Sequence, residues 1–352
     1  MAWKIVGGAA ALLLIVLGGL AVATNGEPDR TAAFAEYRRP LAIPFPEDNP
    51  FQTAKAELGR TLFFEPALSR DGDRTCATCH IPGKDWTDSN PRALRNDGGV
   101  MDFRTPTLLN IAWIETIFGW DGKFRGLETV ARLPLTASGN MNMPPEEMVR
   151  RLSSEPNYVA AFAKAFPEPV AKGGPVTQER IEQALATFQR LIVSGPAPFD
   201  RWVEGDVHAL NPAAKRGFDL FNGKANCAAC HSGWNFTDGS FHDVGVAGEG
   251  ALGRGKFFPN STALRHAFKT PTLRNVARRP PYMHDGSLAT LAEVVDLYDR
   301  GGIDRPSRSR DIRPLHLSAR EKADLIAFME SLDDNGAEGP AYQPIGPEPP
   351  RP

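Results

Sequence analysis

The sequence predicts a mainly helical fold in which two similar domains follow one another along the chain. Two observations predict this duplication. The pentapeptide Cys76-Ala-Thr-Cys79-His80 returns as Cys227-Ala-Ala-Cys230-His231, and each copy is followed by a Thr-Pro-Thr-Leu element, beginning at Thr105 and at Thr270. A third observation, helix-capping residues in both halves, predicts that both are mainly helical. With 352 residues, 41% of them hydrophobic, the chain is long enough for two domains.

The two pentapeptides predict covalent haem attachment. Two thiols one helical turn apart form thioethers to one haem, and the adjacent His reaches its iron from the proximal side. We therefore expect two haem c groups, held by Cys76, Cys79 and His80 and by Cys227, Cys230 and His231. The four cysteines of the chain all fall in these units, and zinc, the alternative, does not require a His after each second Cys. The predicted fold class is thus mainly α, with two cytochrome c-like haem domains related by internal duplication.

Further matches define the elements of each half. A short helical stretch precedes each pentapeptide, Gly59-Arg-Thr-Leu-Phe63 in the first half and Gly217-Phe-Asp-Leu-Phe221 in the second. After each Thr-Pro-Thr-Leu comes a turn, Trp120-Asp-Gly122 or His284-Asp-Gly286. A Leu six residues after the Asp begins a helix in both halves, at Leu127 and Leu291.

Capping residues predict where other helices begin and end. The predicted N-caps are Thr177, Asn211, Thr290 and Ser318, the last two in capping boxes with Glu293 and Glu321. Gly301-Gly302 predicts the end of the helix that follows Thr290. Its residues Leu291, Val294, Val295 and Tyr298 lie on one face.

Composition shifts predict the domain boundaries. We expect a signal peptide or N-terminal membrane anchor at 1–24, haem domains at 25–198 and 199–336, and a disordered proline-rich tail at 337–352. The linker between the halves is predicted at 194–198. Lys4, an apolar run and the triplet Ala21-Val22-Ala23 are typical of a secretory signal, so we expect the protein in the periplasm. The run is also close to the length of a membrane anchor. A net charge of −2 and a pI near 6.4 argue against a nucleic-acid partner.

The two halves differ at the distal face of the haem iron, opposite the proximal His. Tyr298 lies fourteen residues after His284 on the buried face of its helix, whereas Pro134, fourteen residues after Trp120, cannot bind iron. If Tyr298 is a ligand of the second haem, the first haem is open at the matching place and can bind peroxide or oxygen. Two alternatives remain: Tyr298 is an ordinary core residue, or Met283 or His284 is the ligand.

Taken together, these motifs resemble the bacterial di-haem cytochrome c peroxidase/MauG superfamily, over about residues 50–335. The resemblance implies that the first haem is the peroxide site and the second transfers electrons. It also implies that Tyr298 is the distal ligand of the second haem, in the position where MauG-like enzymes carry Tyr and the peroxidases carry Met. Trp120 matches the tryptophan that relays electrons between the haems.

Three departures from the family pattern concern the site. The displaceable distal His of some peroxidases corresponds to Asn96, so we expect the first haem to be open without activation. The family's acid/base glutamate corresponds to Asn140 and its nearby glutamine to Val130; an amide cannot accept a proton at neutral pH. Glu146 or Glu147 is a candidate substitute; the alternative is that both are exposed residues at the start of a helix.

The third departure concerns calcium. Two positions that contribute to the family's inter-haem calcium site hold Arg104 and Arg279. Because guanidinium groups are poor neighbours for a divalent cation, we expect no calcium, or only a weak site made of backbone carbonyls.

Three functional hypotheses follow. The first is a periplasmic di-haem peroxidase that activates hydrogen peroxide at the first haem, with Trp120, Pro134 and Asn140 at its active site and electrons from a small cytochrome c or cupredoxin. The second is a MauG-like enzyme that oxidises side chains of a partner protein. The third is a non-catalytic electron-transfer cytochrome, favoured by the loss of the glutamate at Asn140.

Overall fold

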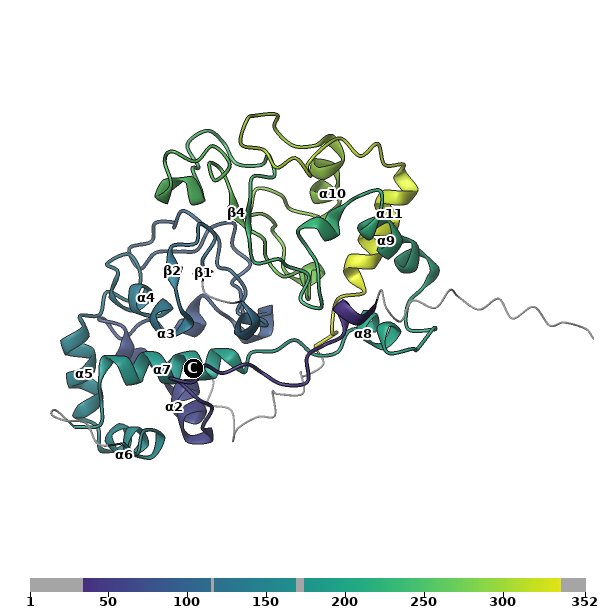
Figure 1. The fold of residues 1–352 in the computed structure, drawn as a ribbon. Coiled ribbons are helices and arrows are strands. Elements are labelled where there is room, and N and C mark those ends of the chain that lie inside the picture. The colour runs from purple at the N-terminus through teal and green to yellow at the C-terminus, as the bar shows by residue number, and fades with distance from the viewer. Residues whose placement is uncertain (1–33, 115–116, 169–173, 337–352) are drawn as a thin grey trace, which may run out of the picture. The chain divides into compact units, whose positions relative to one another are not determined.

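A computed structural model describes residues 34–114, 117–168 and 174–336 of the chain (Figure 1). The predicted leader and the proline-rich tail lie outside the described residues. The α-helices are α2 (Thr53–Phe63), α3 (Leu127–Val130), α4 (Arg132–Thr136), α5 (Pro145–Ser153), α6 (Pro156–Ala165), α7 (Gln178–Arg190), α8 (Pro198–Val203), α9 (Pro212–Asn222), α10 (Leu291–Arg300) and α11 (Ala319–Glu330). Within this part of the chain, no helix is long and apolar enough to cross a membrane.

Short strands form two antiparallel pairs, one in each half. Strand β1 (Ile117–Phe118) pairs with β2 (Phe124–Arg125), and β3 (Phe241–His242) pairs with β4 (Phe268–Lys269). The first pair encloses the predicted Trp120-Asp-Gly122 turn. The described fold is therefore mostly helical with few strands, as predicted.

A helix pair forms the centre of each half and crosses at a repeated glycine. Helix α2 packs on α7 in the first half, and α9 packs on α11 in the second (Figure 1). A Cβ on Gly59 of α2 would lie 1.9 Å from the Ala184 carbonyl oxygen of α7; one on Gly217 of α9 would lie 2.0 Å from that of Asp324 in α11. No side chain fits at such distances, so the backbones can approach this closely only at glycine.

The predicted helix ends are confirmed. The side chains of Thr177, Asn211, Thr290 and Ser318 each accept a hydrogen bond from the first turn of their helix, and the last two lie in capping boxes. Gly301 ends α10 in the left-handed conformation, with φ of 80°. Helices also begin at Leu127 and Leu291, as the repeat predicts.

The helix after the Asp-Gly turn differs between the halves. In the second half α10 continues for ten residues and carries Tyr298. In the first half the same stretch is divided into α3 and α4, with Pro134 in the matching position. Because proline has no N–H, it cannot make the helical hydrogen bond to the residue four before it.

The two halves exchange matched hydrogen bonds through their Thr-Pro-Thr-Leu segments. The asparagine two residues after each element, Asn110 and Asn275, is buried and left-handed, with φ of 59° and 55°. Asn110 donates to Asn235 Oδ1 of the second half at 3.0 Å, and Asn275 donates to Asp85 Oδ1 of the first half at 2.8 Å. This reciprocal exchange joins the proximal sides of the two predicted haem sites.

Residues near the predicted boundaries make contacts across them. The predicted linker at 194–198 is buried at Ser194 and Gly195 and exposed at Pro196; Ser194 N–H donates to Asn110 and Gly195 N–H donates to Asp334. Tyr37, placed by sequence in the first domain, packs in the aromatic core of the second. It stacks on Phe236, with ring centroids 5.4 Å apart.

Candidate haem sites and the cavity between them

Each Cys-x-x-Cys-His unit folds as a single 3-10 turn, at Cys76–Thr78 and Cys227–Ala229. The turn is closed by the His N–H, which donates to the first Cys carbonyl at 3.0 Å in the first unit and 2.9 Å in the second. It brings two thiols and one imidazole to the same wall of a cavity. The sequence spacing therefore produces the same local arrangement twice.

A backbone carbonyl orients each imidazole. His80 Nδ1 lies 3.0 Å from the Trp86 carbonyl oxygen, and His231 Nδ1 lies 2.9 Å from that of Phe236. Because a carbonyl can only accept, Nδ1 carries the proton and Nε2 is left as a ligand. Burial lowers the pKa of both imidazoles, which favours the neutral form that binds a metal.

Matched threonines hold the loops that carry these carbonyls. Thr87 Oγ1 donates to the Thr105 carbonyl at 2.9 Å, and Thr237 Oγ1 donates to the Thr270 carbonyl at 2.7 Å. Each Thr-Pro-Thr-Leu element is thus fastened to the loop that positions the proximal histidine.

Both units open into one continuous cavity of about 450 Å³. All six haem-attachment residues line it, and most of its remaining wall is apolar. The four cysteines form no disulfide. Four thiols, two imidazoles with Nε2 available and an apolar enclosure suit two covalently bound haem c groups.

Tyr298 lines the cavity together with the other inward residues of α10, namely Leu291, Val294 and Val295. Burial raises the pKa of its phenol, so its ionisation requires a nearby cation. Met283 and His284 line the same cavity. His284 lies flat on Phe268, with ring centroids 3.7 Å apart.

Pro134, Val130 and Asn140 line the cavity in the first half. Asn140 lies in the turn after α4 and Asn96 packs behind that turn: its N–H donates to the Gly139 carbonyl at 3.2 Å. Asn96 is not among the lining residues.

The suggestion that Glu146 or Glu147 replaces the missing glutamate is wrong in this structure. Both lie in the first turn of α5, and neither lines the cavity. Glu147 pairs with Arg150 and Arg151, whose hydrogen bonds lower the pKa of its carboxyl to about 2. Among the described lining residues the only carboxylate is Asp311, which belongs to the second half.

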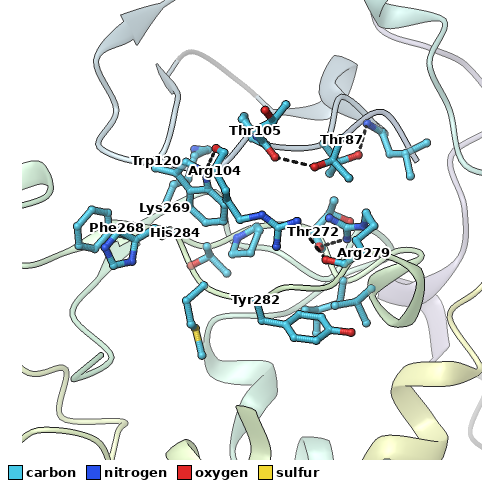
Figure 2. A pocket seen from close by; sticks show the side chains of 18 of the residues that line it. Thr87, Arg104, Thr105, Trp120, Phe268, Lys269, Thr272, Arg279, Tyr282 and His284 are labelled. Carbon is cyan, nitrogen blue, oxygen red and sulfur yellow. Dashed lines mark hydrogen bonds between the residues drawn. The ribbon is translucent and has the colours of Figure 1, made fainter. Parts of the chain in front are cut away.

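Trp120 lies where the two halves meet (Figure 2). Its indole Nε1 donates to the Arg104 carbonyl at 3.0 Å, and its own carbonyl accepts from Lys269 N–H of the second half at 2.8 Å. The indole is thereby fixed on the wall of the cavity that both attachment units line.

Arg104 and Arg279, at the two positions where the family resemblance implies calcium ligands, are buried and bind backbone carbonyls. Arg279 donates to the carbonyls of Thr272 and Arg274 at 2.9 and 2.7 Å, and Arg104 donates to the Arg279 carbonyl at 3.1 Å (Figure 2). These three backbone carbonyls are therefore bound by guanidinium groups.

Sequence reasoning did not single out two other cavity residues. Gln189 of α7 is buried in the wall, and His242 of β3 forms a 2.7 Å ion pair with Asp238. The hydrogen bond to Asp238 raises the pKa of His242 to about 10. Neither residue belongs to a motif, so only the folded arrangement reveals them.

Comparisons with known proteins show the family of this chain and agree with two haem c domains. A family model described as di-haem cytochrome c peroxidase matches residues 53–208, and one described as cytochrome c matches 214–333. The chain is 48% identical to the methylamine utilization protein MauG of Methylorubrum extorquens, over 94% of each chain. It is 34% identical to the cytochrome-c peroxidase IdrP1 of a Pseudomonas species, over 95% of this chain and 97% of that protein.

A solved structure is also similar. The crystal structure of a MauG-like protein associated with microbial copper homeostasis superposes with a TM-score of 0.77 and 30% identity, covering 84% of this chain and 95% of that one.

Proposed function

Since this chain belongs to the di-haem cytochrome c peroxidase and MauG family and carries two covalently bound haem c groups, we propose that it activates hydrogen peroxide at the first haem and passes electrons through the second. His80 holds the first iron, and His231 and Tyr298 hold the second. We further propose that the protein works in the periplasm, where its N-terminal segment directs it.

The difference between Tyr298 and Pro134 carries this proposal. Tyr298 lines the cavity in the second half and offers a phenol oxygen, whereas the matching Pro134 of the first half has no donor atom. An iron with a free coordination position can bind and cleave peroxide, whereas a six-coordinate iron is suited to electron transfer. The two halves thus attach haem in the same way, but only the second half offers a ligand on the distal side.

Residues of the first half shape the peroxide site. Pro134 and Val130 contribute apolar surface to its wall. Asn140 can hydrogen-bond a peroxide through its amide but cannot take its proton. We therefore propose slow proton transfer in this enzyme, since no described carboxylate lines the first half of the cavity.

Trp120 is proposed as the relay between the halves. Its indole is held by the Arg104 carbonyl, and its backbone is bound to β4 of the other half. A rigid aromatic side chain between two redox sites can pass an electron without moving.

A second candidate is oxidation of a partner protein's side chains instead of a small donor. The 48% identity to MauG, against 34% to the peroxidase IdrP1, supports it, as does the proposed tyrosine ligation, because an anionic ligand stabilises oxidised iron. Here the electrons come from the partner protein.

Steady-state turnover with hydrogen peroxide separates these functions. A reduced small cytochrome c or cupredoxin is mixed with the holoprotein and peroxide, and its oxidation is followed by absorbance. Peroxide-dependent oxidation, lost in a His80→Ala variant that retains the second haem, supports the peroxidase. If peroxide oxidises the protein but no donor is consumed, the partner-protein function is favoured. If peroxide has no effect, the protein is an electron-transfer cytochrome and the proposal is wrong.

A further inference from the structure

Two buried positive charges lie in the cavity between the haem sites without a carboxylate to balance them. Arg104 and Arg279 are 7% and 8% exposed as whole residues, and both line the cavity (Figure 2). Among the described residues, no carboxylate forms an ion pair with either guanidinium. Arginine stays protonated in proteins, so both charges persist at neutral pH.

The nearby acids are bound to other groups. Asp85 accepts from Asn275 at 2.8 Å and pairs with Arg278 at 3.1 Å. Asp88 accepts from Thr105 Oγ1 at 2.8 Å. Neutral carbonyls are the partners that remain, and they do not neutralise a charge. Burial accordingly lowers the pKa of Arg104, and that of Arg279 to about 10.

One hydrogen-bond donor of these two arginines has no partner among the described residues. Arg104 Nε is buried and makes no hydrogen bond to any described residue. An unsatisfied buried donor on a cation is costly, and an anion within reach would remove the penalty. Arginine's planar fork suits the two oxygens of a carboxylate.

We propose that Arg104 and Arg279 bind the propionate carboxylates of the haems and supply the positive charge between the two sites. The cavity holds two haems, each with two propionates, and these two guanidiniums are the unpaired buried cations of its described wall. Arg104 comes from the first half and Arg279 from the second, and they are joined by the Arg104 Nη2 hydrogen bond to the Arg279 carbonyl. The pair therefore fastens haem carboxylates and the domain interface together. This inference rests on the two haems and not on the choice of electron donor.

The test measures haem potentials by spectroelectrochemistry, with haem content checked by pyridine haemochrome. Arg104→Met and Arg279→Met each remove a positive charge beside a propionate. Because a nearby positive charge disfavours ferric iron, its loss should favour the ferric state. The oxidised-to-reduced equilibrium of at least one haem should shift by about tenfold, or about 59 mV for a one-electron couple. Arg104→Lys and Arg279→Lys keep the charge and should largely retain the parent potential. The resonance Raman propionate bands should nevertheless move, because lysine cannot offer the fork.

Arg278→Met is the matched control. Arg278 is the neighbour of Arg279, but it is already paired with Asp85, Asp333 and Asp334 and does not line the cavity. Its removal should leave both potentials and the propionate bands unchanged.

Several outcomes would overturn the proposal. The first is that both methionine variants keep the reduction potentials and the propionate bands of the parent. The second is that the reduction potential falls equally in the methionine and lysine variants, which would mean that the arginines act through packing. The third outcome concerns calcium. A calcium chelator should leave the reduction potentials of the parent protein unchanged. If the chelator lowers a potential as much as Arg104→Met does, the positive charge belongs to a metal ion. If the methionine variants bind fewer than two haems, the lysine variants provide the test. Propionate bands that are unchanged in the lysine variants would then contradict the proposal.

Discussion

Positions 134 and 298 occupy the same place in the two halves, seven residues into the stretch that begins at Leu127 or Leu291. One holds a proline inside α4, just after the break between α3 and α4, and the other a tyrosine that lines the cavity. The sequence alone could locate both residues by counting from the repeat. It could not show that Tyr298 shares the cavity with Met283 and His284, because that depends on how a turn and a helix face each other.

The first residue-scale prediction concerns Tyr298→Phe. The substitution keeps the ring and its packing but removes the oxygen, so the second haem should change from low-spin to high-spin in the ferric protein. Electron paramagnetic resonance measures the change. Met283→Leu is the control and should leave the spectrum as it is; the opposite pattern, with Met283→Leu altering the spectrum and Tyr298→Phe silent, would make Met283 the ligand.

The second residue-scale prediction concerns Asn140→Glu. A positioned acid/base contributes typically ~10²–10⁴-fold in rate, so the new carboxylate should accelerate the reaction with hydrogen peroxide in stopped-flow absorbance. The carboxylate must be ionised to accept a proton, so the gain should be present above its pKa and fade below it. Asn140→Gln, which has the length of Glu but no ionisable group, should give no gain. A parent as fast as the Glu variant would show that another group already moves the proton.

At the scale of elements, the helix pairs of the two halves are built alike, and the sequence predicted much of this. Capping residues fixed where α7, α9, α10 and α11 begin, since a cap acts through its own helix turn. The repeated glycines were visible in the sequence, but the sequence did not show why glycine is needed at these positions. The close approach of Gly59 to α7 and of Gly217 to α11 is a contact over more than a hundred residues, which no local pattern records.

Gly217→Ala should destabilise the second half, although alanine ordinarily stabilises a helix. The added Cβ would lie 2.0 Å from the Asp324 carbonyl oxygen, so α9 and α11 must move apart. Overpacking of this kind costs about 1–3 kcal/mol, measurable as a lower melting temperature of the holoprotein. Gly250→Ala, where the new Cβ meets nothing within 4 Å, is the control. Equal melting temperatures for Gly217→Ala and the parent would contradict the close crossing.

At the scale of the whole molecule, duplication gives two haem sites that face one cavity across an interface of matched contacts. The sequence predicted the duplication and both attachment sites because these depend on short motifs. It did not predict the exchange of Asn110 and Asn275, the insertion of Tyr37 into the second half or the Arg104–Arg279 pair. Each of these joins loops from different halves, so each exists only after the halves have packed.

The asymmetry between the two haems is the central claim, and a cyanide titration of the ferric parent protein tests it most directly. Electron paramagnetic resonance is recorded on holoprotein with two haems per chain, before and after cyanide. The first haem should give a high-spin signal that cyanide converts to low-spin. The second should give a low-spin signal that cyanide leaves unchanged, so one equivalent of cyanide binds per chain. Two low-spin signals with no cyanide bound would contradict the account, as would two cyanide-binding haems.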